Sequence, residues 1–436
     1  MFDLEKALTT TANAPQLWQE QLSPQIYNLL VKELPLLEAI GIDQAQSPVH
    51  QYRKRTSVPS GWVQGELGDA DFRSATYELR DVALKIVRSW GGVSSFAQGL
   101  TAQFVNQLQE QINASVLGVA NTLEWLLFFG NASDAFQFNG IEAAVNADAK
   151  AKLAIGNGGS NLDLGGAALS LTNLDAMIDQ TRTYRGSASD KWMFVLSQPM
   201  ISRVSALQTR VTRLTDRVKM EGGLEMETYR GIPLMPTTLF TPLSTSTSPT
   251  LSGSAVAGGT VTAGTYYYAI SSVTLNGEQK ASAAASVTTA TTNLTARLTW
   301  TADANAKLYK VWRGTTNVVA DMSLVAVIPA LTYDANGNVT GALATWDDTG
   351  ANTPNAAVNP LTGTDEIVTL INVTPGERGN RLVGGISPLG EKMDSYMSYV
   401  PLATTNGSYR FMLEGFMALR CAYPELNIIA RNARAA

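Results

Sequence analysis

The chain changes character between residues 241 and 363. On both sides of this stretch, patterns typical of helices alternate with patterns typical of strands. Inside it, Thr, Ala, Ser and Gly predominate, no helical period is present, and short β-type runs such as Tyr266–Ile270 are separated by Asn-Gly turn signals at Asn276 and Asn336. The two outer segments do not look complete without each other. We therefore expect an all-β module, residues 246–357, to be inserted into a host domain.

Composition and charge narrow the class of protein. The chain has 436 residues, of which 45% are hydrophobic and only 16% charged, enough for two or three domains with a sizeable core. Its net charge of −5 argues against a dedicated nucleic-acid-binding surface, and the single Cys421 excludes an internal disulfide framework. The acidic start, Met1–Glu5, is unlike a signal peptide, and the longest apolar run, Leu123–Phe129, is too short to span a bilayer. We expect a soluble protein made in a cytoplasm.

The first 95 residues have the pattern of extensions that lie on a neighbour. Four prolines divide residues 1–48 into short amphipathic stretches, so this part is expected to be an arm without a core of its own. Residues 49–95 alternate in polarity on either side of a tip, 59–71, that is rich in glycine and acidic residues. This pattern predicts a long β-hairpin with too little apolar surface to be stable alone.

A long amphipathic helix is predicted next. Thr101 is a plausible N-cap, and apolar residues then recur at three- and four-residue steps up to Gly130, a residue suited to the end of a helix. About 29 residues at ~1.5 Å each make a rod of roughly 43 Å. The opposite face is mostly amide, from Gln103 to Asn113, and its lack of charge predicts that this face also meets protein.

The remaining host segments alternate between helices and strands. The run Leu171–Thr181 predicts a helix capped by Thr172, with Asp175 in a capping-box position. Trp192–Leu196 has the pattern of a buried strand, and a helix with Pro199 in its first turn should follow it. Further strands are expected at 229–236, 366–373, 381–385 and, closing the chain, within 409–430.

The order of these elements resembles that of the major capsid proteins of tailed bacteriophages, the family that shares the HK97 fold. The resemblance rests on the arm, the hairpin, the long helix, the segment Trp192–Pro199 and the closing segment Ala422–Ile429, and it covers both host segments. It implies an α+β capsid fold with an arm, an extended loop, a spine helix and an axial domain. The implied divisions are 1–48 for the arm, 49–95 for the extended loop, 96–245 for the first part of the peripheral and axial domains, and 358–436 for the second part of the capsid core.

The insert has a resemblance of its own, to fibronectin type III and related immunoglobulin-like domains. It rests on short strand-like runs such as Gly264–Ile270 and on a central tryptophan. The resemblance implies a β-sandwich with its core around Tyr267, Trp300, Tyr309 and Val311. With a polar linker on each side, the module is expected to project from the shell, to bind host glycans or a neighbouring module, and to be dispensable for shell closure.

The sequence carries no catalytic or cofactor motif. The single histidine, His50, lies in the predicted hairpin, where a contact with a neighbouring subunit is its expected role, and no Gly-x-Ser-x-Gly element is present. Residues 156–161 begin like a dinucleotide fingerprint but have Asn161 where the third glycine is needed. Asp334–Asn338 has the first spacing of a calcium loop, yet Thr345 occupies the place of the bidentate Glu. We predict a protein that is not an enzyme and uses no cofactor or metal.

The hairpin tip supplies one group of candidate contacts between subunits. It contains Trp62, an aromatic residue of the kind that anchors interfaces, together with the carboxylates of Glu66, Asp69 and Asp71. Two other interpretations of these carboxylates stay open, a divalent-ion site and a solvated loop.

A basic run supplies the second group. Arg210, Arg213 and Arg217 have acidic residues nearby, which favours salt bridges between subunits over contact with packaged DNA. Some capsids of this family form a covalent cross-link between lysine and asparagine. Lys54 and Lys85 lie in the hairpin, but no matched Asn and catalytic Glu can be identified, so no cross-link is expected.

The resemblance implies that the chain assembles with itself. We expect hexamers and pentamers that form an icosahedral head around double-stranded phage DNA, assembled in the host cytoplasm, with decoration or scaffolding proteins as further partners and no membrane. Two alternatives stay open. One is the shell of an encapsulin-like compartment with a protein cargo, and the other is a surface adhesin or enzyme with an accessory fibronectin-like domain. The lack of a signal peptide and of a catalytic set disfavours the second.

Overall fold

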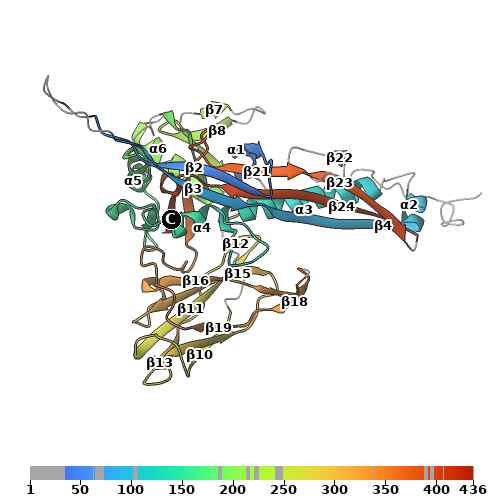
Figure 1. Ribbon diagram of the computed structural model, residues 1–436. Coiled ribbons are helices and arrows are strands. Elements are labelled where there is room, and N and C mark those ends of the chain that lie inside the picture. The colour runs from blue at the N-terminus through green and yellow to red at the C-terminus, as the bar shows by residue number, and fades with distance from the viewer. Residues whose placement is uncertain are drawn as a thin grey trace, which may run out of the picture.

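The chain folds into a body and an insert that lies against it (Figure 1). The structure, a computed structural model, describes residues 35–435 apart from 62, 64–72, 102–106, 185–188, 213–216, 220–224, 241–248, 336, 387–390, 393–396 and 406. Two β-sheets, a β-hairpin and their helices form the described body, and two further sheets with a small hairpin form the insert.

The first sheet of the body is organised around one long strand. β24 (Ser408–Arg420) pairs with β4 along one side and with β21 and β23 along the other. The other members are β1 (Ile42–Gln44), β4 (Lys85–Ser94), β21 (Arg381–Ile386), β22 (Glu391–Lys392) and β23 (Ser398–Thr405). Exposure alternates along β4, because one face of the strand packs on helix α3 and the other faces outward.

The hairpin is shorter than predicted. β2 (Val49–Ser57) and β3 (Thr76–Ala83) form an antiparallel pair that starts at Val49 and Ala83. The Leu84 N–H then donates to the Pro48 carbonyl at 2.9 Å, and the chain continues as β4. The hairpin therefore ends at Ala83 and not at residue 95, because β4 pairs with β24, a strand too distant in sequence for a local pattern to reveal.

The predicted long helix is present as α3, whose described part spans Gln107–Phe129. The short helix α2 (Ser95–Thr101) precedes the undescribed residues 102–106, so Thr101 lies within a helix and the prediction that it is an N-cap is wrong. Gly130 follows α3 as predicted. A Cβ at this position would lie 2.5 Å from the Leu126 carbonyl oxygen, so glycine is required.

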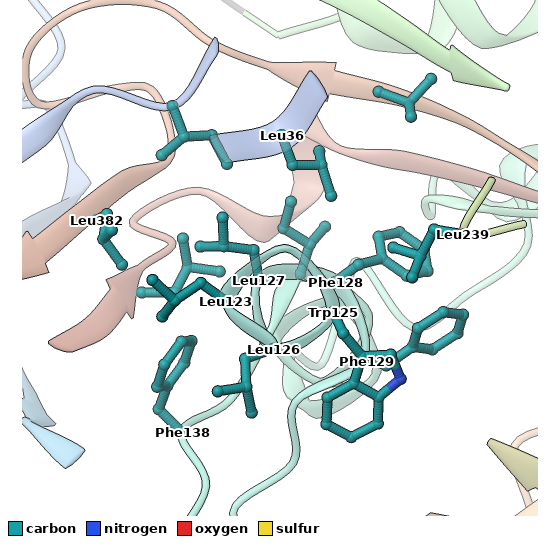
Figure 2. Packing of buried hydrophobic residues seen from close by; sticks show 14 of the residues in the cluster. Leu36, Leu123, Trp125, Leu126, Leu127, Phe128, Phe129, Phe138, Leu239 and Leu382 are labelled. Carbon is teal, nitrogen blue, oxygen red and sulfur yellow. The ribbon is translucent and has the colours of Figure 1, made fainter. Parts of the chain in front are cut away.

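The two halves of α3 have different surroundings. Figure 2 shows its C-terminal end enclosed by buried side chains, among them Leu36 of the arm and Leu239 of the body. Toward the other end, Gln109, Gln111 and Asn113 of the amide face are exposed within the single chain. By length and composition alone α3 could cross a membrane, but 56% of its most apolar stretch is buried inside the protein, as in a core helix.

A buried glutamate on α3 holds the arm. The Glu124 carboxylate accepts hydrogen bonds from the N–H groups of Leu36 (3.0 Å) and Leu37 (2.8 Å), and so caps the short helix α1 (Pro35–Ala39).

Glu124→Ala should lower the free energy of unfolding by about 2–4 kcal/mol in urea titrations, because both N–H groups lose this acceptor. Glu124→Gln keeps one acceptor oxygen and should cost roughly half as much. Equal losses in the two variants would contradict the capping role.

The second sheet of the body has the strand order β5-β25-β20-β6-β9-β8-β7. Its central strands, β20 (Glu366–Asn372) and β6 (Trp192–Leu196), are buried, as their apolar runs predicted. The others are β5 (Asn161–Asp163), β7 (Arg217–Lys219), β8 (Glu225–Tyr229), β9 (Ile232–Pro236) and β25 (Ile428–Ala433).

Two helices accompany this sheet, α5 (Leu171–Arg182) and α6 (Gln198–Thr212). Both were predicted, but the cap of α5 is Ser170 and not Thr172, since the Ser170 hydroxyl accepts from the Asn173 N–H at 3.3 Å. The Asp175 carboxylate does not close a capping box; it accepts from the hydroxyl of Tyr229, the last residue of β8. The predicted closing strand is divided into β24, a turn at 424–426, and β25.

The insert contains two β-sheets and a hairpin. One sheet has the order β10-β14-β19, and the other has the order β12-β11-β15-β16 with β13 added beside β11. Strands β17 and β18 form the hairpin. The bounds are β10 (Leu251–Val256), β11 (Gly264–Thr274), β12 (Gly277–Glu278), β13 (Ala285–Thr289), β14 (Thr295–Trp300), β15 (Ala306–Gly314), β16 (Ser323–Pro329), β17 (Leu331–Tyr333), β18 (Val339–Ala342) and β19 (Thr345–Asp348).

Residues of both sheets form one buried cluster. Trp300, Tyr309 and Val311 belong to it, and the Trp300 and Tyr309 rings meet edge-on with centroids 5.2 Å apart. Tyr267 does not belong to it. Side chains alternate along a strand, so the neighbouring Tyr268 takes the position in this cluster and Tyr267 packs against a second cluster on the opposite face of β11.

Candidate interdomain and subunit-contact sites

Four buried charges meet where the insert touches the body. Lys310 of β15 and Glu278 of β12 come from the insert, whereas Glu142 of α4 (Ile141–Ala147) and Arg431 of β25 come from the body. The Lys310 ammonium lies 2.6 Å from Glu142 Oε1 and 2.7 Å from Glu278 Oε2. Arg431 donates to the same two oxygens, at 2.8 and 2.5 Å. No side chain of this charge quartet is more than 7% exposed.

The charge quartet is electrically neutral. Burial alone would raise the pKa of Glu278, but the charges of Arg431 and Lys310 outweigh burial and lower that pKa. Burial alone would lower the pKa of Arg431, and the carboxylates of Glu278 and Glu142 raise it above its usual value. These two groups therefore keep their charges at neutral pH, as a buried ion network requires.

The insert also completes the hydrophobic core of the body. Val273 and Leu308 of the insert belong to the same buried cluster as Phe129 of α3. The turn after β11 approaches the body so closely that a Cβ on Gly277 would lie 1.9 Å from the Leu239 carbonyl oxygen. The two units thus share apolar surface as well as charges.

The hairpin β17–β18 makes a further contact with the body. The Tyr333 hydroxyl donates to Asp134 Oδ2 at 3.1 Å, and the Tyr333 ring meets that of Phe136 edge-on at 4.9 Å. Burial, followed by the Asp134 charge, raises the pKa of Tyr333 to about 12, so the phenol stays a donor. The expectation of a module held by polar linkers alone is therefore wrong, because charges, apolar side chains and this hairpin all fix the insert on the body.

The predicted turn at Asp334 is confirmed in place of a calcium loop. Its carboxylate accepts from the N–H of Asn338 at 2.8 Å, which closes the turn between β17 and β18. In the part of the chain that the structure describes, no group of three or more His, Cys, Asp or Glu side chains is placed to hold a metal ion.

The inner face of the hairpin β2–β3 is bound to the body by polar groups. Lys54 Nζ lies 3.2 Å from Glu425 Oε1, and Arg80 lies 3.7 Å from Asp148. His50 lies on the same face, and its expected contact with a neighbouring subunit stays a prediction. Burial, followed by the nearby charge of Arg420, lowers the pKa of His50, while Asp43 acts in the opposite direction.

Strand β4 presents large apolar side chains to solvent. Ile86 and Trp90, which we call the β4 strip, are 51% and 65% exposed on the face that points away from α3. Among the described strands β4 pairs only with β24, so its other edge has no strand partner there. On the outer face of the hairpin, Tyr77 and Leu79 are 58% and 60% exposed. Such side chains mark a surface that a protein partner can cover.

Most of the predicted contact residues lie outside the described part of the chain. These are Trp62, Glu66, Asp69 and Asp71 in the hairpin tip and Arg213 after α6. Arg210 lies in the last turn of α6 and Arg217 begins β7, at positions where the structure describes the backbone but not the side chains. All seven remain predictions.

Sequence reasoning missed the charge quartet. Glu142 and Lys310 are 168 positions apart, and Glu278 and Arg431 are 153 apart, so no local spacing links them. The one signal was Lys310 itself, a cation within the otherwise mostly apolar strand β15. A lysine buried in a strand needs a buried anion, but the sequence does not say which one.

The long helix, the hairpin and the two sheets of the body fit an HK97-like fold. The holo-SrpI encapsulin of Synechococcus elongatus PCC 7942 is 11% identical, with 98% of this chain and 97% of that chain covered and a TM-score of 0.53, which shows a shared fold. The cyanophage A-1(L) capsid (10% identity, 98% and 99% covered) and the capsid of the native GTA particle (9%, 98% and 100%) each have a TM-score of 0.49. No curated protein sequence matches the chain.

A family model assigns the chain more narrowly. The model described as SU10 major capsid protein matches residues 5–232, more than half of the sequence. The chain therefore belongs to the SU10 major capsid protein family. It is a phage major capsid protein, a structural component of the virion that assembles with copies of itself into a shell.

Proposed function

We propose that the subunits form hexamers and pentamers of an icosahedral head, assembled in the host cytoplasm, that encloses double-stranded DNA. The observation that carries this proposal is the exposure of the β4 strip beside a strand edge without a described partner. A monomer would leave these side chains in water, whereas a shell covers them with neighbouring subunits. We also propose that the hairpin tip with Trp62, Glu66, Asp69 and Asp71, and the run of Arg210, Arg213 and Arg217, take part in contacts between subunits.

The same proposal divides the chain into an arm (1–48), an extended loop (the hairpin, 49–83), and capsid core segments 84–245 and 358–436 on either side of the insert. We infer that the insert, 246–357, is an immunoglobulin-like sandwich of the fibronectin type III kind that faces the exterior. Its support is the cluster of Trp300, Tyr309 and Val311, to which both sheets contribute. An exterior module is available to host glycans or decoration proteins, and scaffolding proteins are further candidate partners.

The contents of purified particles distinguish a phage head from an encapsulin-like compartment. Particles from infected cells should contain DNA that resists nuclease until the shell is opened. Particles that hold a protein cargo and no nuclease-protected DNA would support the encapsulin alternative.

Replacing a residue of the β4 strip should weaken assembly without unfolding the subunit. Trp90→Ser removes an exposed indole, so the melting temperature of the unassembled subunit should change little. Interface aromatics contribute about 2 kcal/mol or more when truncated, so the yield of closed particles in sucrose gradients should fall by at least tenfold.

Val339→Ser provides a matched control on the insert, since Val339 is 58% exposed on β18. This control should assemble like the natural protein. A normal yield of particles from the Trp90→Ser variant would show that the β4 strip does not take part in contacts between subunits.

A further inference from the structure

The charge quartet consists of two pairs that are each neutral on their own. Within the insert, Lys310 lies 2.7 Å from Glu278, and within the body, Arg431 lies 2.8 Å from Glu142. Docking adds the two crossed contacts, Lys310 to Glu142 at 2.6 Å and Arg431 to Glu278 at 2.5 Å. Each unit can therefore form its own ion pair before the two meet. Docking then places these two ion pairs side by side with their charges in opposite order.

This arrangement of charges favours one alignment of the insert on the body over all others. Desolvation of four charges offsets most of their mutual attraction, so a buried network adds little net stability compared with apolar residues of the same size. A displaced alignment is different, because a shift of a few ångströms would leave a buried charge facing a like charge or no charge. The network thus penalises wrong orientations more than it rewards the correct one.

Packing at this joint leaves one part of it open. A cleft of about 240 Å³ lies between α4 and strands β15 and β16, lined by Glu142 and Lys310 of the quartet and by Asn146, Leu324 and Val327. Two charges of the quartet, those of Glu142 and Lys310, therefore stand where apolar side chains do not fill the joint.

We propose that the four residues of the charge quartet are positioning residues: they set the orientation of the insert on the body more than they hold the two together. Every subunit of a shell then presents its insert in one orientation.

Variants of the full-length chain distinguish an effect on orientation from an effect on stability. Lys310→Met leaves an unbalanced buried carboxylate and should lower the melting temperature by roughly 5–10 °C. Lys310→Met with Glu278→Gln removes the whole pair of the insert, restores neutrality, and should melt within about 3 °C of the natural protein.

Orientation is measured by electron cryomicroscopy of assembled particles. The double variant should give density for the insert that is clearly weaker than that of the body, whereas Lys310→Arg, which keeps the charge, should retain both melting temperature and sharp density. If the variants do not assemble, hydrogen exchange of unassembled protein replaces imaging. Asp134 and Phe136 contact Tyr333 of the hairpin β17–β18, so amides of the segment 131–139 should then exchange at least fivefold faster in the double variant.

Two results would overturn the proposal. A double variant as unstable as Lys310→Met would mean that the charges act as the main attachment of the insert. A double variant with natural stability and natural density or exchange rates would mean that other contacts set the orientation.

Discussion

A chain in which a short Gly/Ser linker replaces residues 246–357 is expected to aggregate instead of forming closed particles. The deletion removes Val273 and Leu308 from the core of the body and uncovers the apolar atoms they contact around Phe129. Exposure of this kind costs about 1.5–3 kcal/mol for each large side chain and creates an adhesive patch. The sequence alone predicted that this deletion would be tolerated. Size-exclusion chromatography and thermal unfolding of the deletion chain test whether it aggregates, as the structure leads us to expect.

A control separates loss of the insert from disturbance of its connection. Replacing residues 241–248 with Gly/Ser residues of the same number leaves the quartet and the shared core intact, so this variant should remain soluble and assemble. Closed particles from the deletion chain, with a melting temperature close to the natural one, would show that the insert is dispensable.

Gly277→Ala should dislodge the insert from the body. Gly277 has φ +107°, and a Cβ there would lie 1.9 Å from a backbone oxygen of Leu239, an atom that cannot rotate away. Strain and clash together should lower stability by about 3 kcal/mol or more, seen as a lower midpoint in thermal unfolding.

Gly258→Ala is the matched control for this prediction. Gly258 also belongs to the insert and has φ +90°, but a Cβ there would meet nothing within 4 Å. Only backbone strain of about 1–2 kcal/mol is expected. Equal losses in the two variants would mean that the close approach of Gly277 to the body contributes nothing.

Local patterns predicted the elements that depend on local physics. The buried strand Trp192–Leu196, the helix stop at Gly130 and the turn at Asp334 follow from an apolar run, steric exclusion of a side chain and an Asn-Gly turn signal. The predictions were wrong where contacts between segments distant in sequence determine the structure. The end of the hairpin at Ala83 depends on pairing between β4 and β24, more than 300 positions later in the chain.

The interdomain site was beyond sequence reasoning for the same reason. The polar composition of the segments that lead into and out of the insert carries no information about which surfaces meet. The contact of Lys310 with Glu142 joins the insert to the body and so depends on how the two parts meet. Choosing Tyr267 over Tyr268 for the core was a different kind of error, a shift of one residue in a run of three tyrosines that offers no alternation to read.

Helix α3 joins two regions that should move on different timescales. Every residue from Leu123 to Phe129 is buried, whereas Gln109, Gln111 and Asn113 near the other end face solvent. Amide protons of the enclosed end can exchange only when the core itself opens, whereas those of the solvent-facing end need only local fraying. A single rod therefore has one end anchored and one end compliant. A force applied to α3 near Gln109 would be relieved by unwinding of that end before it could disturb the junction with the insert.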